Sequence, residues 1–127
     1  MEPLRIDQTI NTPKVIFDPD ELFLRISGPS RPESADKFFA PLIKWLNDFK
    51  IQRPSTSVPL NVEIKIAYLN SASRIYLTSL FKIINEIHID GMRVLIDWFV
   101  DEDDDVMRET GQELSENTGL PFNIVEE

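Results

Sequence analysis

The sequence contains no cysteine and a single histidine, His88. The lack of cysteine excludes a disulfide framework, a thiolate zinc site and a cysteine nucleophile, and it fits a reducing compartment. With one histidine and no cysteine, the sequence lacks most of the side chains that form the usual nucleophile–base pairs and zinc sites. His88 lies near the predicted end of a helix, where the helix dipole favours a cationic side chain, so we expect a structural role for it. We therefore expect no catalytic residue, no metal ligand and no cofactor.

Glycine and long apolar runs are also scarce. The four glycines are scattered and form no phosphate-binding loop. No segment approaches the roughly 18 apolar residues of a membrane span, and the first ten residues lack the pattern of a signal peptide. A net charge of −9 without a basic stripe repels nucleic-acid backbones. These features predict a cytoplasmic protein that does not hydrolyse nucleotides, bind nucleic acid or insert into a membrane.

The length and composition suit one folded domain. A chain of 127 residues has the usual size of a single domain, and a hydrophobic content of 42% is enough for one core. We expect residues 1–127 to form this domain, with residues 1–11 as an N-terminal arm.

Hydrophobic periodicity predicts an α/β fold of order β-β-α-β-α-β-α-β. Alternating or short apolar segments predict five strands, at residues 15–17, 22–27, 60–68, 92–100 and 122–125. Helical spacing predicts helices at 35–50 and 71–89 and a third that begins in an acidic run and ends near residue 117. Pro41 lies inside the first helix, where we expect a kink or a later helix start. The first two strands form an antiparallel hairpin around the turn at residues 18–21, and right-handed crossovers make the last three strands parallel.

The polar positions of the third strand predict that helices cover mainly one face of this mixed sheet. The other face would carry aromatic, apolar and charged side chains together, namely Phe23, Arg25, Glu63, Lys65, Arg93, Leu95, Asp97 and Phe99. Phe23, Leu95 and Phe99 form a possible partner surface, and the alternative is a solvated face with a few stray apolar residues.

The acidity is concentrated near the C-terminus. Residues 101–116 hold eight acidic side chains and one arginine. Asp101 to Asp105 could be imagined as a divalent-metal site, and a small metal-dependent enzyme is the alternative function. The run lacks the ligand alternation and the glycine of a calcium loop. We favour the start of a helix, where the dipole and free amides stabilise negative charge.

The junction between the third strand and the second helix is the most informative segment. Asn70 or Ser71 can cap the helix by accepting an amide hydrogen bond, and Ser73 can assist in the same turn. The same place also suits a phosphate, because free amides and the helix dipole stabilise its charge and Arg74 is close in sequence.

Several segments together resemble the SiaC-type regulatory phosphoproteins, whose fold is similar to the STAS domain of anti-sigma-factor antagonists. The similarity covers almost the whole chain from Thr12 onward. It rests on Thr12-Pro13, Pro32-Glu33, Pro41-Leu42 with Trp45-Leu46, the junction Tyr68-Leu69-Asn70-Ser71-Ala72-Ser73, the strand of Trp98 running into acids, and Leu120-Pro121-Phe122-Asn123-Ile124.

The resemblance implies a bacterial partner-switching protein that is not an enzyme. A cognate serine/threonine kinase would phosphorylate Ser71, which follows the junction asparagine, and a PP2C-type phosphatase would reverse this. Ser73 is the second candidate acceptor, and Asn70, Ala72 and Arg74 complete the surroundings of the site. The unphosphorylated form would bind and stimulate a diguanylate cyclase, which links the switch to cyclic di-GMP and biofilm regulation.

Overall fold

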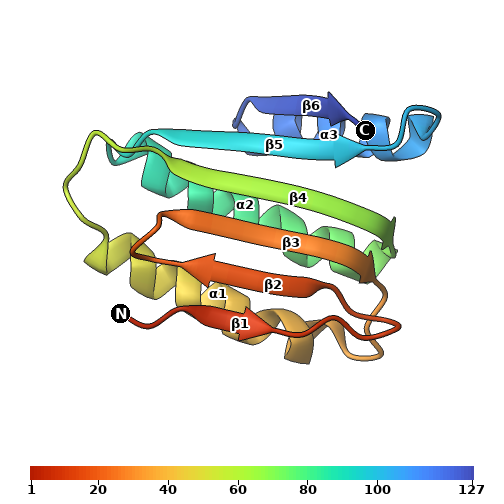
Figure 1. The fold of residues 1–127 in the computed structure, drawn as a ribbon, viewed down its shortest axis with the longest axis horizontal. Helices are drawn as coiled ribbons and strands as arrows, with labels where there is room; N and C mark the ends of the chain where they lie inside the picture. The colour runs from red at the N-terminus through yellow and green to blue at the C-terminus, as the bar shows by residue number, and fades with distance from the viewer.

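The computed structural model describes all 127 residues as a mixed sheet with one layer of helices (Figure 1). The strands lie in the spatial order β1-β2-β3-β4-β5-β6. Their bounds are β1 Leu4–Ile6, β2 Lys14–Asp18, β3 Phe23–Ser30, β4 Leu60–Leu69, β5 Val94–Val100 and β6 Phe122–Glu126. The helices are α1 Ala35–Gln52, α2 Ser71–Ile89 and α3 Asp105–Thr118. The predicted α/β class is confirmed, with six strands in place of five.

The antiparallel half of the sheet contains the additional strand. The predicted hairpin is present, because β2 pairs antiparallel with β3 and the Asp18 carboxylate accepts the amides of Asp20 and Glu21 in the turn. Strand β1 then pairs antiparallel with β2 on its outer side. Residues 1–11, predicted as an arm, thus include a strand of three residues. This segment is too short for alternation to be recognised, and long-range pairing gives it its structure.

In the parallel half of the sheet, the strands end and two helices begin along one edge. Strands β3, β4, β5 and β6 are parallel neighbours, which confirms the predicted crossovers for the last three. Their carboxyl ends therefore lie along one edge of the sheet. Figure 1 shows that α2 and α3 both begin at this edge, directly after β4 and β5. Such edges commonly hold the binding sites of open α/β sheets.

The core lies between the sheet and the helices. It is a cluster of 27 buried hydrophobic residues, and the strands alternate between these and more exposed positions. Trp98 is fully buried in β5 and stacks on Phe122 of β6, with ring centroids 5.9 Å apart. All three helices cover the same face, as Figure 1 shows, so the prediction of one covered face is confirmed. No helix is long and apolar enough to span a membrane.

Two local predictions need correction. Helix α1 begins at Ala35 and continues through Pro41, so it does not start later. Pro41 and Lys37, whose carbonyl loses the proline's hydrogen bond, are both exposed, and water can satisfy that carbonyl. Helix α3 begins at Asp105, with Asp104 as its N-cap, so most of the acidic run precedes the helix.

Candidate functional site

The start of α2 is tied down by Asn70. Its side-chain oxygen accepts the amide of Ser73 at 2.8 Å, and its own amide donates to the carbonyl of Ser30 at the end of β3, at 3.0 Å. Of the four amides at this helix start, these two have partners. The amides of Ser71 and Ala72 lie between them and have no intrahelical carbonyl to bond. The predicted helix cap is therefore Asn70, and Ser71 is the first helical residue.

The two serines of this turn have opposite environments. The Ser71 residue is exposed, whereas Ser73 is 0% exposed. The Ser73 hydroxyl accepts a hydrogen bond of 2.8 Å from the hydroxyl of Ser30, another buried side chain. This pair anchors the first turn of α2 to the end of β3. Sequence reasoning missed Ser30, because it lies 43 residues from Ser73 and no local pattern connects them.

Arg74 connects α2 with α3. Its guanidinium donates to the carboxylate of Glu113, and the two side chains form an ion pair. Both reach solvent, with side-chain exposures of 38% for Arg74 and 56% for Glu113. Glu113 was another residue that sequence reasoning missed, since it was only one acid among eight in its region.

A hollow of about 340 Å³ opens beside Ser71. The end of β4, the start of α2 and the start of α3 line it, with Ser71, Arg74 and Asp104 among the polar side chains. Two large apolar side chains at its wall are exposed, Tyr68 by 49% and Val106 by 74%. The hollow thus combines a free hydroxyl, both signs of charge and exposed apolar surface in one place.

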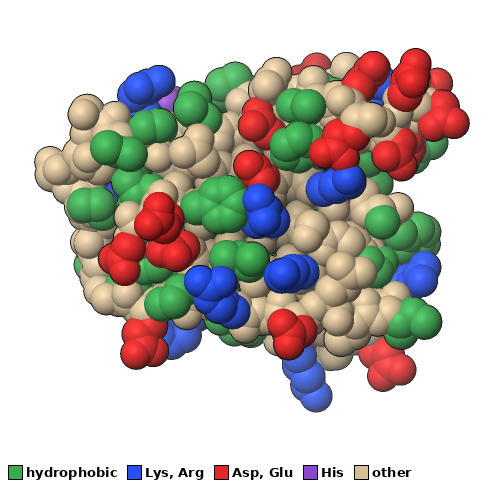
Figure 2. Space-filling view, viewed as in Figure 1, with side chains coloured by type: hydrophobic (Ala, Val, Ile, Leu, Met, Phe, Trp, Pro, Cys, Tyr) green, Lys and Arg blue, Asp and Glu red, His purple; other side chains and the backbone are tan.

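The acidic run forms the neighbouring corner of the molecule. Figure 2 shows acidic side chains gathered at the corner of the sheet where β5 ends and α3 begins. The Asp104 carboxylate accepts the amide of Met107 at 3.0 Å and so caps α3. No group of three His, Cys, Asp or Glu side chains is placed to hold a metal ion. Only the end of the run belongs to the helix start, with Asp104 as the N-cap and Asp105 as the first helical residue.

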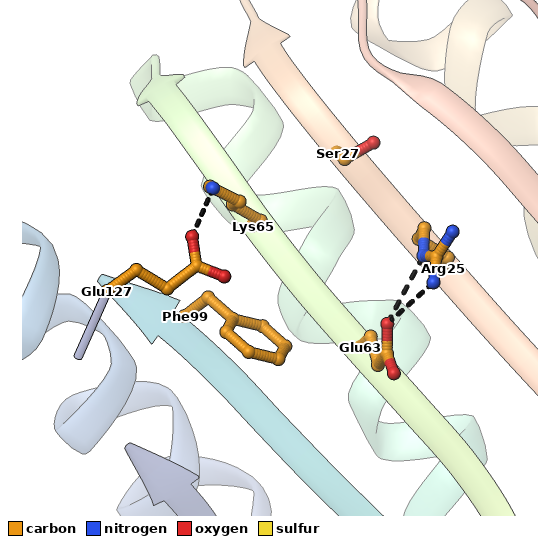
Figure 3. Close-up of a pocket in the computed structure, with 6 residues that line it drawn as sticks. All are labelled: Arg25, Ser27, Glu63, Lys65, Phe99 and Glu127. Atoms are coloured by element: carbon orange, nitrogen blue, oxygen red, sulfur yellow. Dashed lines mark hydrogen bonds and ion pairs between the residues drawn. The ribbon is translucent and has the colours of Figure 1, made fainter. Parts of the chain in front are cut away.

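The helix-free face of the sheet carries a second, smaller hollow of about 200 Å³. Figure 3 shows the Phe99 ring between two ion pairs, Arg25 with Glu63 and Lys65 with Glu127. The Arg25 guanidinium also lies 4.8 Å from the centre of the Phe23 ring. The hydrogen bond from Lys65 to Glu127 raises the pKa of Lys65 above its ordinary value.

The predicted members of this face are placed as expected, with one exception. Phe23, Leu95 and Phe99, the possible partner surface, lie at the alternate positions that do not point into the core. Leu95 is 46% exposed, and the two phenylalanines are half-buried. Arg93 precedes β5 and is not part of the strand.

His88 bonds through Nδ1 with the carbonyl of Met92 at 3.2 Å, which ties the end of α2 to the following turn.

Comparisons with known proteins identify relatives of similar length and the same fold. The chain is 27% identical over 124 residues to an uncharacterised protein of Pseudomonas aeruginosa strain UCBPP-PA14, covering 98% of this chain and 96% of that protein. It is similar to the structure of SiaC of Pseudomonas aeruginosa, with a TM-score of 0.88, 27% identity and full coverage of both chains. It is equally similar, with a TM-score of 0.88, 27% identity and coverage of 98% and 99%, to a structure of the diguanylate cyclase SiaD in complex with its activator SiaC.

The SiaC family of regulatory phosphoproteins matches residues 6–127, which include every element from β2 to β6 and the whole Ser71 junction. The chain therefore belongs to the SiaC family of regulatory phosphoproteins.

Proposed function

We propose that this protein is a phosphorylation-controlled partner switch, that Ser71 is its phosphoacceptor, and that it acts by binding and not by catalysis. The observation that carries the proposal is the contrast between the two serines of the first turn of α2. Ser71 is exposed at the rim of a hollow, whereas the Ser73 hydroxyl is buried and bonded to Ser30. A kinase can reach the first hydroxyl without disturbing the fold, and it would have to unwind the helix start to reach the second.

The chemistry of the helix start favours a phosphate at Ser71. A phosphoserine carries a charge of about −1.5 to −2 at neutral pH and three strong acceptor oxygens. The amides of Ser71 and Ala72 have no intrahelical partner, and the positive end of the helix dipole lies at the same place. Because the cap by Asn70 and the Ser30–Ser73 bond hold this turn, the modified chain keeps its fold.

The proposed partners are those that the family resemblance implies. A cognate serine/threonine kinase adds the phosphate and a PP2C-type phosphatase removes it. The unphosphorylated protein binds and activates a diguanylate cyclase, by analogy with the SiaD–SiaC complex of Pseudomonas aeruginosa. This places the protein in cyclic di-GMP signalling. The exposed Tyr68 and Val106 beside the Ser71 hollow give such a partner apolar surface to bury. A charge of about −2 in their midst would oppose that burial.

The test uses three proteins, the wild type and the Ser71→Ala and Ser73→Ala variants. Each is incubated with the kinase and ATP, and the phosphopeptides are mapped by mass spectrometry. We expect phosphate on Ser71 in the wild type and in folded Ser73→Ala, and none in Ser71→Ala. Undiminished phosphorylation of Ser71→Ala together with its loss in Ser73→Ala would refute the assignment.

A second assay tests the output. The cyclase from the same organism is mixed with unmodified protein, phosphorylated protein and Ser71→Ala, and cyclic di-GMP formation is measured. We expect stimulation by the unmodified and Ser71→Ala forms and its loss on phosphorylation. A Ser71→Asp variant should imitate the phosphorylated form only in part, since a carboxylate has less charge and fewer oxygens. Equal stimulation by phosphorylated and unmodified protein would contradict the switch.

A further inference from the structure

The ion pair between Arg74 and Glu113 occupies a special position. It joins the first turns of α2 to the middle of α3, and its arginine lines the same hollow as Ser71. Ser71 and Arg74 are three residues apart in one helix, so their side chains lie on the same side of it. A group added to the Ser71 hydroxyl therefore enters the reach of the Arg74 guanidinium.

We propose that phosphate on Ser71 takes the Arg74 guanidinium away from Glu113 and so breaks the side-chain tie between α2 and α3. This inference rests on the proposed phosphorylation of Ser71. The two anions compete for one cation, and the phosphate has about twice the charge of a carboxylate and more acceptor oxygens. A guanidinium binds a phosphate through two parallel hydrogen bonds, which strengthens its preference. Both side chains of the existing pair reach solvent, so little buried structure resists the exchange.

The exchange changes more than the charge of one residue. Once Arg74 turns to the phosphate, Glu113 on α3 loses its partner. Asp104, on the wall of the same hollow, also faces the added negative charge. The modification at the start of α2 is thereby transmitted to α3, the second helix that begins at this edge of the sheet. A partner that binds across the hollow would meet an altered α3 surface as well as the phosphate.

The test measures the phosphate directly. Phosphoserine is installed at position 71 of the full chain by genetic-code expansion, and its second ionisation is followed by phosphorus NMR. The groups that face it are Arg74 on α2 and Asp104 and Glu113 on α3. We expect Arg74→Gln to raise the midpoint by about one unit, because a neighbouring guanidinium favours the doubly charged form. Arg74→Lys should give an intermediate value, since lysine keeps the charge without the paired geometry.

A double-mutant cycle separates competition from simple electrostatics. Glu113→Gln removes a negative charge and releases Arg74, so we expect it to lower the midpoint in the wild-type background. In the Arg74→Gln background that lowering should shrink to the small effect of the charge alone. Arg108→Gln is the matched control, since Arg108 lies on α3 but pairs with Glu126. We expect it to leave the midpoint unchanged.

The outcomes are decisive and distinct from those of the phosphorylation assay. An unchanged midpoint in both folded Arg74 variants, or equal effects of Glu113→Gln with and without Arg74, would overturn the inference. Because the phosphoserine is installed without a kinase, this result does not depend on whether the kinase chooses Ser71. Absence of phosphate on Ser71 in the kinase assay would instead overturn the proposed function.

Discussion

The close contact between α3 and Trp98 predicts that Gly111→Ala lowers the stability of the protein, whereas helix propensity alone would raise it. Gly111 is buried within α3, and a Cβ atom added there would lie 2.6 Å from Cδ1 and Nε1 of Trp98. The indole is 0% exposed, and its Nε1–H donates to the carbonyl of Met107 at 3.0 Å. Neither the helix nor the indole can move apart without disturbing that hydrogen bond.

Three effects determine how Gly111→Ala changes the free energy of unfolding, one of them stabilising and two destabilising. Helix propensity alone favours alanine by about 0.8–1.0 kcal/mol. Overpacking of a buried contact opposes this by about 1–3 kcal/mol. Weakening the buried indole hydrogen bond adds up to about 1 kcal/mol. We therefore expect a net destabilisation of about 1–2 kcal/mol, which corresponds to a fall in Tm of roughly 3–10 °C for a domain of this size.

Urea denaturation followed by circular dichroism measures this change, and calorimetry checks the Tm. Gln112→Ala is the control, because Gln112 is exposed in the same helix and its change should stay within about 0.5 kcal/mol. If Gly111→Ala were as stable as the wild type or more stable, α3 would not pack on Trp98 in the described way. The positions of Asp104 at the Ser71 hollow and of Glu113 beside Arg74 depend on that packing.

Three further predictions concern the surface. The double substitution Asp103→Asn and Asp104→Asn should lower the free energy of unfolding by about 1 kcal/mol or less in urea denaturation, because asparagine also caps helices. Unfolding of this double variant in ordinary buffer would refute the assignment of the acidic run as a solvated helix start. Phe99→Ser should weaken a pull-down of partners while the Tm stays nearly unchanged, whereas loss of the fold would place Phe99 in the core. Glu127→Gln should lower the raised pKa of Lys65 toward 10.5 in an NMR titration. The pair's contribution is fully present below pH 10.5 and is lost as the pH rises through the raised pKa, so an unaltered Lys65 titration would contradict the described ion pair.

Capping residues, turn residues and hydrophobic spacing in the sequence were enough to predict the helices and most of the strands. Helix α2 begins and ends at the predicted residues, because a capping asparagine precedes it and Asp90-Gly91 follows its apolar spacing. The parallel order of the last strands followed from their separation by helices. The exposed sheet face followed from the alternation in β4, whose polar residues Glu63 and Lys65 leave the core to the other face.

The remaining features depend on contacts between distant segments, which no local pattern reveals. Strand β1 exists because it pairs with β2, and Trp45 of α1 donates to the carbonyl of Glu2 at 2.9 Å beside it. The burial of Ser73 depends on Ser30, and the state of Arg74 depends on Glu113. The sequence could therefore suggest two serines as acceptors, and only the fold distinguishes their surroundings.

The separation between the core and the Ser71 hollow explains how modification could change binding without unfolding the chain. The 27 residues of the core do not include Ser71, and the cap of α2 joins the Asn70 side chain to the Ser73 amide without involving the Ser71 hydroxyl. A phosphate therefore adds charge at a backbone position that is already fixed, next to free amides that stabilise it. The free energy of unfolding should change little, while a partner that buries the hollow encounters the full electrostatic and desolvation penalty. We therefore expect the proposed phosphorylation of Ser71 to leave the chain folded, with the same exposed helix start accessible to a phosphatase.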